Sequence, residues 1–190
     1  MPRKPTYGRN DLISRARDLF WRQGWAGTSL KDLEAALEMK PGSFYAAFGS
    51  KEALFELAME KYATDGAAGL QALAQDHGPI EALKRYIMKA VGSENAPAKA
   101  CMLSKTLLEL HANDHPLARK ANHYLVQMEG QFSRLFRQAQ ADGDIAPGHD
   151  PKVLARRYQS DLLGLRVSAQ REGIDAMAIA HEMADGLGRL

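Results

Sequence analysis

Residues 40–48 are a short run of basic, small and aromatic side chains that could contact DNA: Lys-Pro-Gly-Ser-Phe-Tyr-Ala-Ala-Phe. On a helix Phe44 and Phe48 share one side, because they are four residues apart, and can pack on the protein. The side chains left for other faces are those of Ser43, Tyr45, Ala46 and Ala47. An eight-residue helix is about 12 Å long, comparable to the width of a major groove, and Gly42 lets its first turn approach closely. The pattern predicts the second helix of a helix-turn-helix.

Residues at the starts of neighbouring helices supply further candidates. Lys51 follows the capping residue Ser50, where a positive charge opposes the helix dipole. An anionic partner such as a phosphate gives Lys51 a reason to be there, although it could also be a solvated lysine. Thr28 and Ser29 precede another helix and would serve as caps in any helical protein, so their contact with DNA stays one of two interpretations.

Positive charge is concentrated at the front of the chain. Residues 1–51 hold nine Lys and Arg against five Asp and Glu, whereas residues 52–190 hold sixteen against eighteen. Such an excess is compatible with a phosphate-binding face but does not require one. Arg3, Lys4 and Arg9 could add phosphate or minor-groove contacts.

Two other groups could do chemistry. Cys101 lies near the start of a predicted helix, where the dipole can favour a reactive thiolate, but a lone cysteine among apolar residues is more often a core residue. His111 and His115 have a metal-binding spacing. Because His115 precedes Pro116, we expect solvated histidines at a helix end and no metal site. A single cysteine also excludes an internal disulfide.

Composition indicates a folded protein of two parts. The 190 residues are 45% hydrophobic and 25% charged, and we find neither an apolar run of membrane-spanning length nor a signal peptide, so we expect a cytoplasmic protein. Eight of the fourteen aromatic residues fall within residues 1–55. Large side chains let a short segment form its own core, so we predict one domain at 1–55 and a second at 56–190.

Apolar spacing and capping residues predict an all-α protein of about nine helices. No segment alternates with the period of a strand. The predicted helices begin near Asn10, Ser29, Pro41, Lys51, Pro79, Cys101, Pro116, Pro151 and Asp175.

Residues 10–55 resemble the TetR/AcrR transcriptional regulators, through Thr-Ser-Leu-Lys-Asp-Leu at 28–33 and Pro-Gly-Ser-Phe-Tyr-Ala-Ala-Phe-Gly-Ser-Lys-Glu-Ala-Leu-Phe at 41–55. The resemblance implies an N-terminal three-helix DNA-binding domain, a fourth linking helix, and a divergent helical ligand-binding and dimerisation domain. Some electrophile-sensing relatives have a cysteine placed like Cys101. The positions that resemble the family's DNA contacts are Thr28, Ser29, Lys40, Gly42, Ser43, Tyr45 and Lys51. Ala46 and Ala47 replace more polar residues, which favours contact with thymine methyl groups.

A stripe of small residues on the helix from Pro151 is a candidate dimer interface. Ser160, Gly164 and Ser168 stand four residues apart and let another helix approach closely. The stripe could equally pack against the final helix of its own chain. The TetR resemblance favours the interface, because it implies that the last two helices meet at the two-fold axis.

The expected function is that of a homodimeric repressor of a palindromic operator, released by a small-molecule or electrophile effector. Its partners are then double-stranded DNA, the effector and a second copy, with no cofactor and no membrane. A constitutive DNA-binding protein without an effector is the first alternative. An all-helical enzyme is the second, but the sequence has no P-loop, no Gly-x-Gly-x-x-Gly, no His-Glu-x-x-His and no nucleophile elbow.

Overall fold

The computed structural model describes residues 7–190, and helices are the only regular secondary structure in that range. This confirms the predicted all-α class and the number of helices. The helices are α1 (Arg9–Gln23), α2 (Leu30–Leu37), α3 (Pro41–Phe48), α4 (Lys51–His77), α5 (Pro79–Gly92), α6 (Met102–Leu110), the short 3-10 helix η1 (His111–Asn113), α7 (Pro116–Asp142), α8 (Pro151–Ser168) and α9 (Ala176–Leu187).

Local capping fixes most helix starts as the sequence predicts. Ser29 and Asp32 form a reciprocal capping box at α2, and the Ser50 hydroxyl accepts from the backbone N–H of Ala53 at α4. Helix α1 begins at Arg9, one residue before the predicted start near Asn10. Gly8 occupies the cap position, and its carbonyl accepts from the backbone N–H groups of Asp11 and Leu12.

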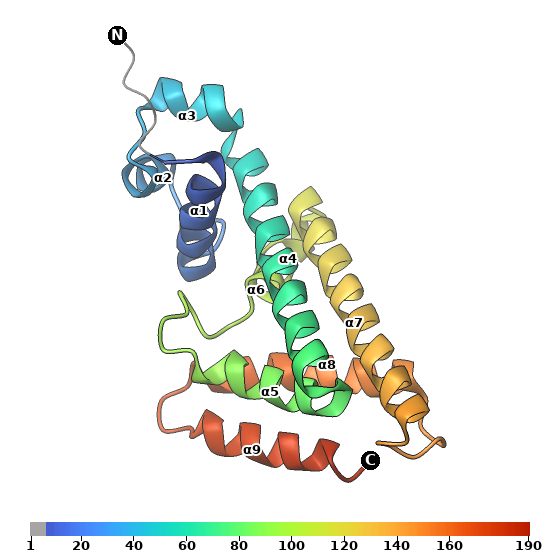
Figure 1. Cartoon of the computed structure of the whole chain (residues 1–190). Coiled ribbons are helices and arrows are strands. Elements are labelled where there is room, and N and C mark those ends of the chain that lie inside the picture. Colours follow the sequence, from blue (N-terminus) through green and yellow to red (C-terminus); the bar gives the residue numbers. More distant parts are fainter. Residues whose placement is uncertain (1–6) are drawn as a thin grey trace.

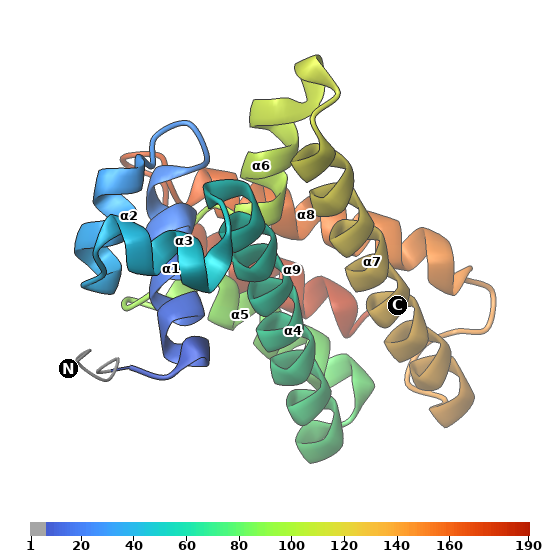
Figure 2. The ribbon, with the colours of Figure 1, turned by 90° about the horizontal axis from the view of Figure 1, so that it is seen from above.

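The long helices α4 and α7 run most of the length of the molecule (Figure 1). Helices α1, α2 and α3 lie at one end, and α5, α8 and α9 lie across the other. Seen from above, α1 to α3 group beside the upper part of α4 (Figure 2). Because α4 belongs to both ends, movement of either end relative to the other must involve this helix.

Two hydrophobic cores follow from this arrangement. The first joins the buried faces of α1 to α3 and of the N-terminal half of α4 to residues from α6 and the start of α7. Phe20 and Phe55 meet edge to face in it, with ring centroids 4.6 Å apart. The second core joins α5, α8 and α9 to the C-terminal half of α7. The buried aromatic residues of the first 55 therefore share one core with buried residues as far along the chain as Leu125.

Three tyrosines in or beside these cores make the free energy of unfolding depend on pH in alkaline solution. Burial raises the pKa of Tyr86 to about 12, against the opposing charge of Arg166. Burial also raises the pKa of Tyr62 and of Tyr158 well above its ordinary range, and the Tyr158 hydroxyl donates to the Leu83 carbonyl at 2.8 Å. These phenols stay protonated in the folded state at pH values where the unfolded chain ionises.

We therefore predict that the free energy of unfolding falls as the pH rises from about 10 toward 12, because the unfolded state then binds fewer protons than the folded state. Urea unfolding at about pH 8, 10 and 11 measures this slope. Tyr158→Phe lowers stability at pH 8 by losing a hydrogen bond, but it flattens the slope. Tyr45→Phe, on an exposed side chain, serves as the matched control. A Tyr158→Phe slope equal to that of the wild type contradicts the prediction.

Candidate nucleic-acid interface

Helix α3 presents a small exposed surface at the end of the molecule remote from α9 (Figure 1). Phe44 is completely buried and Phe48 nearly so, whereas Tyr45 is 49% exposed. Gly42 and Ser43 are exposed on its first turn. The division of faces is the one that the Phe spacing predicts, and it leaves the N-terminal end of α3 free to enter a groove.

The backbone conformation explains the residue types at the two ends of α3. Lys40 is the exposed N-cap residue, and Pro41 occupies the first position, where it costs no hydrogen bond. Gly49 ends the helix at φ 76°, a conformation that favours glycine. Arg9 donates from Nη1 to the Ala47 carbonyl at 2.7 Å, so a basic residue from α1 lies beside the last turn of α3. Arg3 and Lys4 lie outside the described residues.

At the start of α2 the structure separates the two predicted contacts. Ser29 is exposed; its hydroxyl donates to Asp32 Oδ2 at 2.6 Å, and hydrogen bonds from Ser29 lower the pKa of that carboxyl. Thr28 is completely buried, and its hydroxyl donates to the Gly24 carbonyl at 2.7 Å. The expected contact between the Thr28 side chain and DNA is thus corrected, because this hydroxyl closes the turn between α1 and α2.

Lys51 has a protein partner at the start of α4. Its ammonium donates to the Trp25 carbonyl at 2.7 Å and lies 4.1 Å from the centroid of the Trp25 ring. Partial burial lowers the pKa of Lys51, while Glu109 and Asp32 act against that effect. Lys51 therefore fastens α4 to the α1–α2 turn, and its contact with a phosphate stays a prediction.

Two residues of helix α6 form hydrogen bonds with the same turn and with the end of α1, and neither was a candidate from the sequence. Lys105 Nζ donates to the Trp21 carbonyl at 2.9 Å and to that of Arg22 at 3.3 Å. Glu109 accepts from the backbone N–H of Trp25 at 3.1 Å and from that of Ala26 at 2.7 Å. We call Lys105 and Glu109 the α6 clasp. Their spacing of four residues is typical of an ion pair within one helix, so the sequence alone gives no sign of this role.

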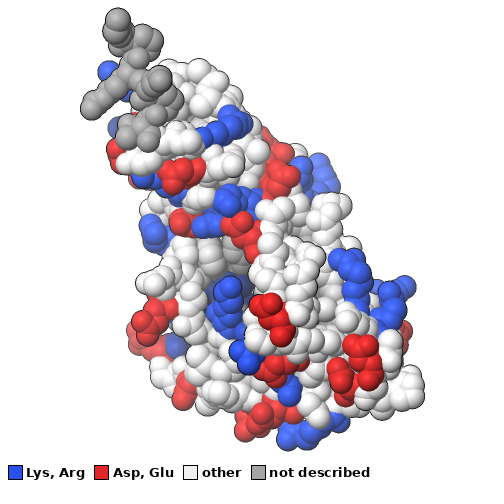
Figure 3. Space-filling view, viewed as in Figure 1, with Lys and Arg blue, Asp and Glu red and all other residues white. Residues whose placement is uncertain are grey.

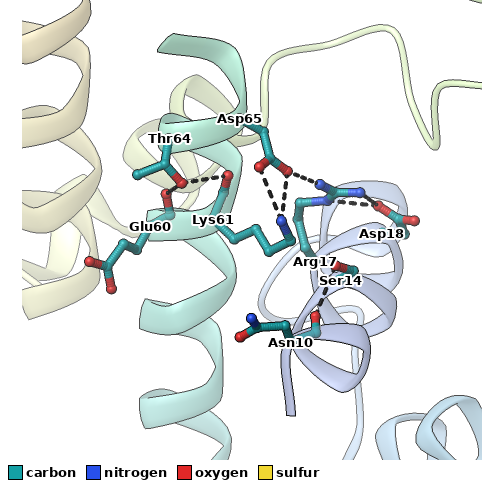
Figure 4. A network of polar contacts seen from close by, with 8 residues as sticks. All are labelled: Asn10, Ser14, Arg17, Asp18, Glu60, Lys61, Thr64 and Asp65. Atoms are coloured by element: carbon teal, nitrogen blue, oxygen red, sulfur yellow. Dashed lines mark hydrogen bonds and ion pairs between the residues drawn. The ribbon is translucent and has the colours of Figure 1, made fainter. Parts of the chain in front are cut away.

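An ion pair between Arg17 and Asp65 also joins the sides of helices α1 and α4 (Figure 4). Arg17 of α1 binds Asp18 and reaches Asp65 of α4, which also accepts from Lys61 at 3.0 Å. The Arg17 side chain is 20% exposed. Partial exclusion of water strengthens such pairs relative to those on open surface.

Beside these ion pairs lies a cavity of about 240 Å³ between α1 and the helices of the rest of the protein. Figure 3 shows the molecule hollowed on this face, with both basic and acidic side chains around the hollow. Residues from five helices and the segment after α5 line the cavity: Arg17, Trp21, Tyr62, Asp65, Gly66, Gly69, Tyr86, Lys89, Ala90, Ser93, Ala96, Met128 and Arg166. We call it the interdomain cavity.

Cys101 is buried in the first core, as the N-cap residue of α6. The Tyr62 hydroxyl is its neighbour, and the presence of Cys101 contributes, after burial, to the raised pKa of that phenol. Burial agrees with the core role that the sequence favours. It leaves reaction with an electrophile dependent on opening of the start of α6.

The small-residue stripe on α8 faces outward. Ser160 and Gly164 are exposed, and Ser168 is half-buried. A Cβ atom built on Gly164 meets no atom within 4 Å. Packing of Ser160 and Gly164 against the final helix of the same chain, the alternative to a dimer interface, is therefore wrong.

The remaining candidates are structural. His115 lies outside the helix, as predicted, and its Nδ1 accepts from the backbone N–H of Leu117 at 3.1 Å, which caps α7. Within residues 7–190 no three His, Cys, Asp or Glu side chains gather where a metal ion could be held. Over the same range, no helix has the length and apolarity needed to cross a membrane.

A short exposed helix held by two phenylalanines, preceded by a capped helix and a tight turn, defines a helix-turn-helix DNA-binding protein. Two family models match the chain: "Bacterial regulatory proteins, tetR family" over residues 12–58, and "Tetracyclin repressor-like, C-terminal domain" over residues 79–184. The chain belongs to the TetR family of transcriptional regulators.

Individual relatives extend over nearly the whole chain. The HTH-type transcriptional repressor ComR of Escherichia coli is 30% identical over 177 residues, which cover 90% of this chain and 83% of ComR. The repressor DhaR of Mycobacterium sp. is 24% identical over 185 residues, which cover 92% of this chain and 89% of DhaR. One similar solved structure is a cysteine mutant of the TetR family regulator CifR in complex with 26 bp operator DNA. It has a TM-score of 0.80 and 28% sequence identity, and the match covers 100% of this chain and 98% of the CifR chain.

We predict that Glu109→Ala destabilises the fold by about 1–2 kcal/mol, because two backbone N–H groups of the α1–α2 turn lose a charged acceptor. Urea unfolding measures the change. Glu60→Ala, on an exposed residue of α4, is the matched control and should stay within about 0.5 kcal/mol of the wild type. Equal stability of the two variants would show that the clasp contributes nothing.

Proposed function

We propose that this chain is a homodimeric, effector-responsive repressor that reads operator DNA with α3. One observation carries the proposal: α3 is anchored by two buried phenylalanines and leaves its N-terminal half exposed at the end of the molecule. The relatives named as repressors, and the DNA complex of CifR, support it. The proposed DNA contacts are Ser29, Lys40, Gly42, Ser43, Tyr45 and Lys51, with Arg9 beside them.

The chemistry of these positions divides into two roles. Lys40 and Ser43 lie at the N-terminal end of α3, where the charge of the lysine and the helix dipole favour phosphate. Tyr45 is large, exposed and able to donate a hydrogen bond, so it is the residue best suited to contact a base edge. Ala46 and Ala47 add no polar group and suit thymine methyls.

We predict that Tyr45→Ala weakens binding to a selected operator by about 1–3 kcal/mol, and that Lys40→Ala weakens binding to all duplexes alike and lowers the salt slope by about one. Fluorescence anisotropy against the tightest duplex from a random pool, and against a shuffled duplex, separates the two effects. Lys152→Ala, on exposed α8, is the matched control. Retention of wild-type operator affinity by the Tyr45 and Lys40 double variant rules out α3 as the reader.

The dimer is proposed to form through the outward face of α8. Ser160 and Gly164 leave a shallow strip flanked by Val153 and Val167, which are 57% and 55% exposed. Apolar side chains beside small ones let two helices approach and bury area. A dimer can then present two α3 helices to major grooves about 34–36 Å apart, which requires a nearly palindromic operator.

We predict that Gly164→Leu weakens or abolishes the dimer while helicity by circular dichroism is kept, because an isobutyl group separates the two helices. Sedimentation velocity at micromolar concentration measures the change. Gly130→Leu is the matched control: it also substitutes a helical glycine whose Cβ would meet nothing within 4 Å. An undisturbed dimer in Gly164→Leu contradicts this interface, as does a monomeric wild type.

The interdomain cavity is the proposed effector site. Two larger hollows, of about 450 and 390 Å³, are lined only by residues after position 66. The interdomain cavity instead includes Arg17 and Trp21 of α1, so its contents bear directly on the DNA-binding end. This favours a regulated repressor over a constitutive DNA-binding protein.

A second candidate effector is an electrophile that reacts with Cys101, the only thiol of the chain. Its position at the start of α6, the helix that carries the clasp, favours this route. We predict that Cys101→Ser keeps operator affinity and loses any release caused by iodoacetamide, measured by anisotropy, because no other sulfhydryl can be alkylated. Release that is the same in wild type and Cys101→Ser excludes Cys101 as the sensor.

A further inference from the structure

The walls of the interdomain cavity carry an excess of positive charge. Three basic residues line it, Arg17, Lys89 and Arg166, against the single carboxylate of Asp65. Asp65 is already shared by Arg17 and Lys61. Among residues 7–190, no carboxylate forms an ion pair with Arg166 or Lys89, so two cations on the wall lack a protein counter-ion.

Arg166 is held in place while part of its guanidinium stays available. Its Nε donates to the Lys99 carbonyl at 2.7 Å, and its Cζ lies 5.6 Å from the centroid of the Trp21 ring. Its charge also acts on the Tyr62 and Tyr86 phenols, where it opposes the effect of burial on their pKa. A guanidinium fixed by one nitrogen keeps the other two to bind a planar anion.

Two glycines of α4 make room on the opposite wall. A Cβ atom at Gly66 would lie 3.4 Å from the Tyr86 hydroxyl, and one at Gly69 would lie 3.7 Å from Lys89 Nζ. Glycine weakens the interior of a helix relative to alanine. Both distances are ordinary van der Waals contacts, so a methyl group would fit, whereas a larger side chain would fill the space beside Tyr86 and Lys89.

The rest of the wall is apolar and largely aromatic. Trp21, Tyr62, Ala90 and Met128 come from four different helices. Rings of this kind stack on flat molecules. A volume of about 240 Å³ corresponds to roughly eight water molecules in the liquid, which suits a small flat body with a single polar end.

We propose that the interdomain cavity binds a small organic anion, a carboxylate on a flat apolar body, whose charged end is held by Arg166 and Lys89 with the Tyr86 hydroxyl. The apolar body lies against Trp21, Tyr62 and Met128. The inference rests on the proposed function only in taking this ligand as the effector; the ligand class itself follows from the charge and shape of the wall.

Binding to the full-length protein without DNA tests the ligand class. The probes are benzoate and trans-cinnamate, each paired with its neutral amide, followed by tryptophan fluorescence and by thermal unfolding up to about 10 mM probe. We expect the carboxylates to bind at least about tenfold more tightly than the amides, since a lost charge-assisted hydrogen bond costs that much. Trp25→Phe, which replaces the tryptophan outside the cavity, should keep the fluorescence change, because that change comes from Trp21 in the wall.

Variants then locate the site. Lys89→Met and Arg166→Gln should each weaken carboxylate binding about tenfold or more, and Lys89, being exposed, can be replaced without harm to the fold. Gly66→Val should block binding with every charge retained. Arg137→Gln, on an exposed residue of α7, is the matched control for loss of one arginine and should bind as the wild type does.

Three results overturn the proposal: amides that bind as tightly as carboxylates, no binding of either carboxylate, or unchanged binding in both Lys89→Met and Arg166→Gln. Operator affinity of the ligand-free protein is titrated in parallel. Failure to bind any duplex overturns the proposed function and leaves the measured ligand class standing, so the two failures are distinguishable.

Discussion

The attachment of α6 to the α1–α2 turn is the contact on which the rest of the structure depends. The end of α1 exposes carbonyl groups that Lys105 satisfies, and the turn exposes N–H groups that Glu109 satisfies. A lysine at a helix C-terminus and a carboxylate facing free N–H groups are each favourable placements. Together they fix the orientation of the DNA-binding helices on the C-terminal part.

This attachment explains why the first hydrophobic core is not confined to the first 55 residues. Helix α6 contributes Met102, Leu103 and Leu110 to that core, beside the phenylalanines of α1 and α4. Polar groups of the turn are satisfied at its edge while apolar side chains fill its middle. The DNA-binding end is consequently supported by residues more than eighty positions away in the chain.

Helix α1 joins the two ends of the molecule in three different ways. Its last turn is held by the α6 clasp, its side is paired with α4 through Arg17 and Asp65, and Trp21 donates to the Ala100 carbonyl at 2.6 Å. The interdomain cavity lies among these contacts. Allosteric coupling requires that a ligand favour one of two arrangements, and a ligand in this cavity would contact Arg17 and Trp21 of α1 directly.

The sequence by itself determined the elements and the faces of the DNA-binding end. The capping box at Ser29, the proline that starts α3 and the spacing of Phe44 and Phe48 act over four residues or fewer, so their physics is contained in a short segment. For the same reason the family resemblance of residues 10–55 was visible in the sequence. The small stripe on α8 was also visible, and the structure then showed that Ser160 and Gly164 are exposed.

Only the tertiary structure decided where the polar groups of the turns find partners. Thr28 looked like a candidate DNA contact, but its hydroxyl turns inward to the Gly24 carbonyl. Lys51 stays a proposed contact, and only the fold shows that its ammonium also binds the Trp25 carbonyl. The α6 clasp joins residues far apart in the chain. The wall of the interdomain cavity likewise brings together Arg17, Lys89 and Arg166 from three different helices. A buried or half-buried polar group must find a partner, and which partner is near depends on how the helices pack, which the local sequence does not encode.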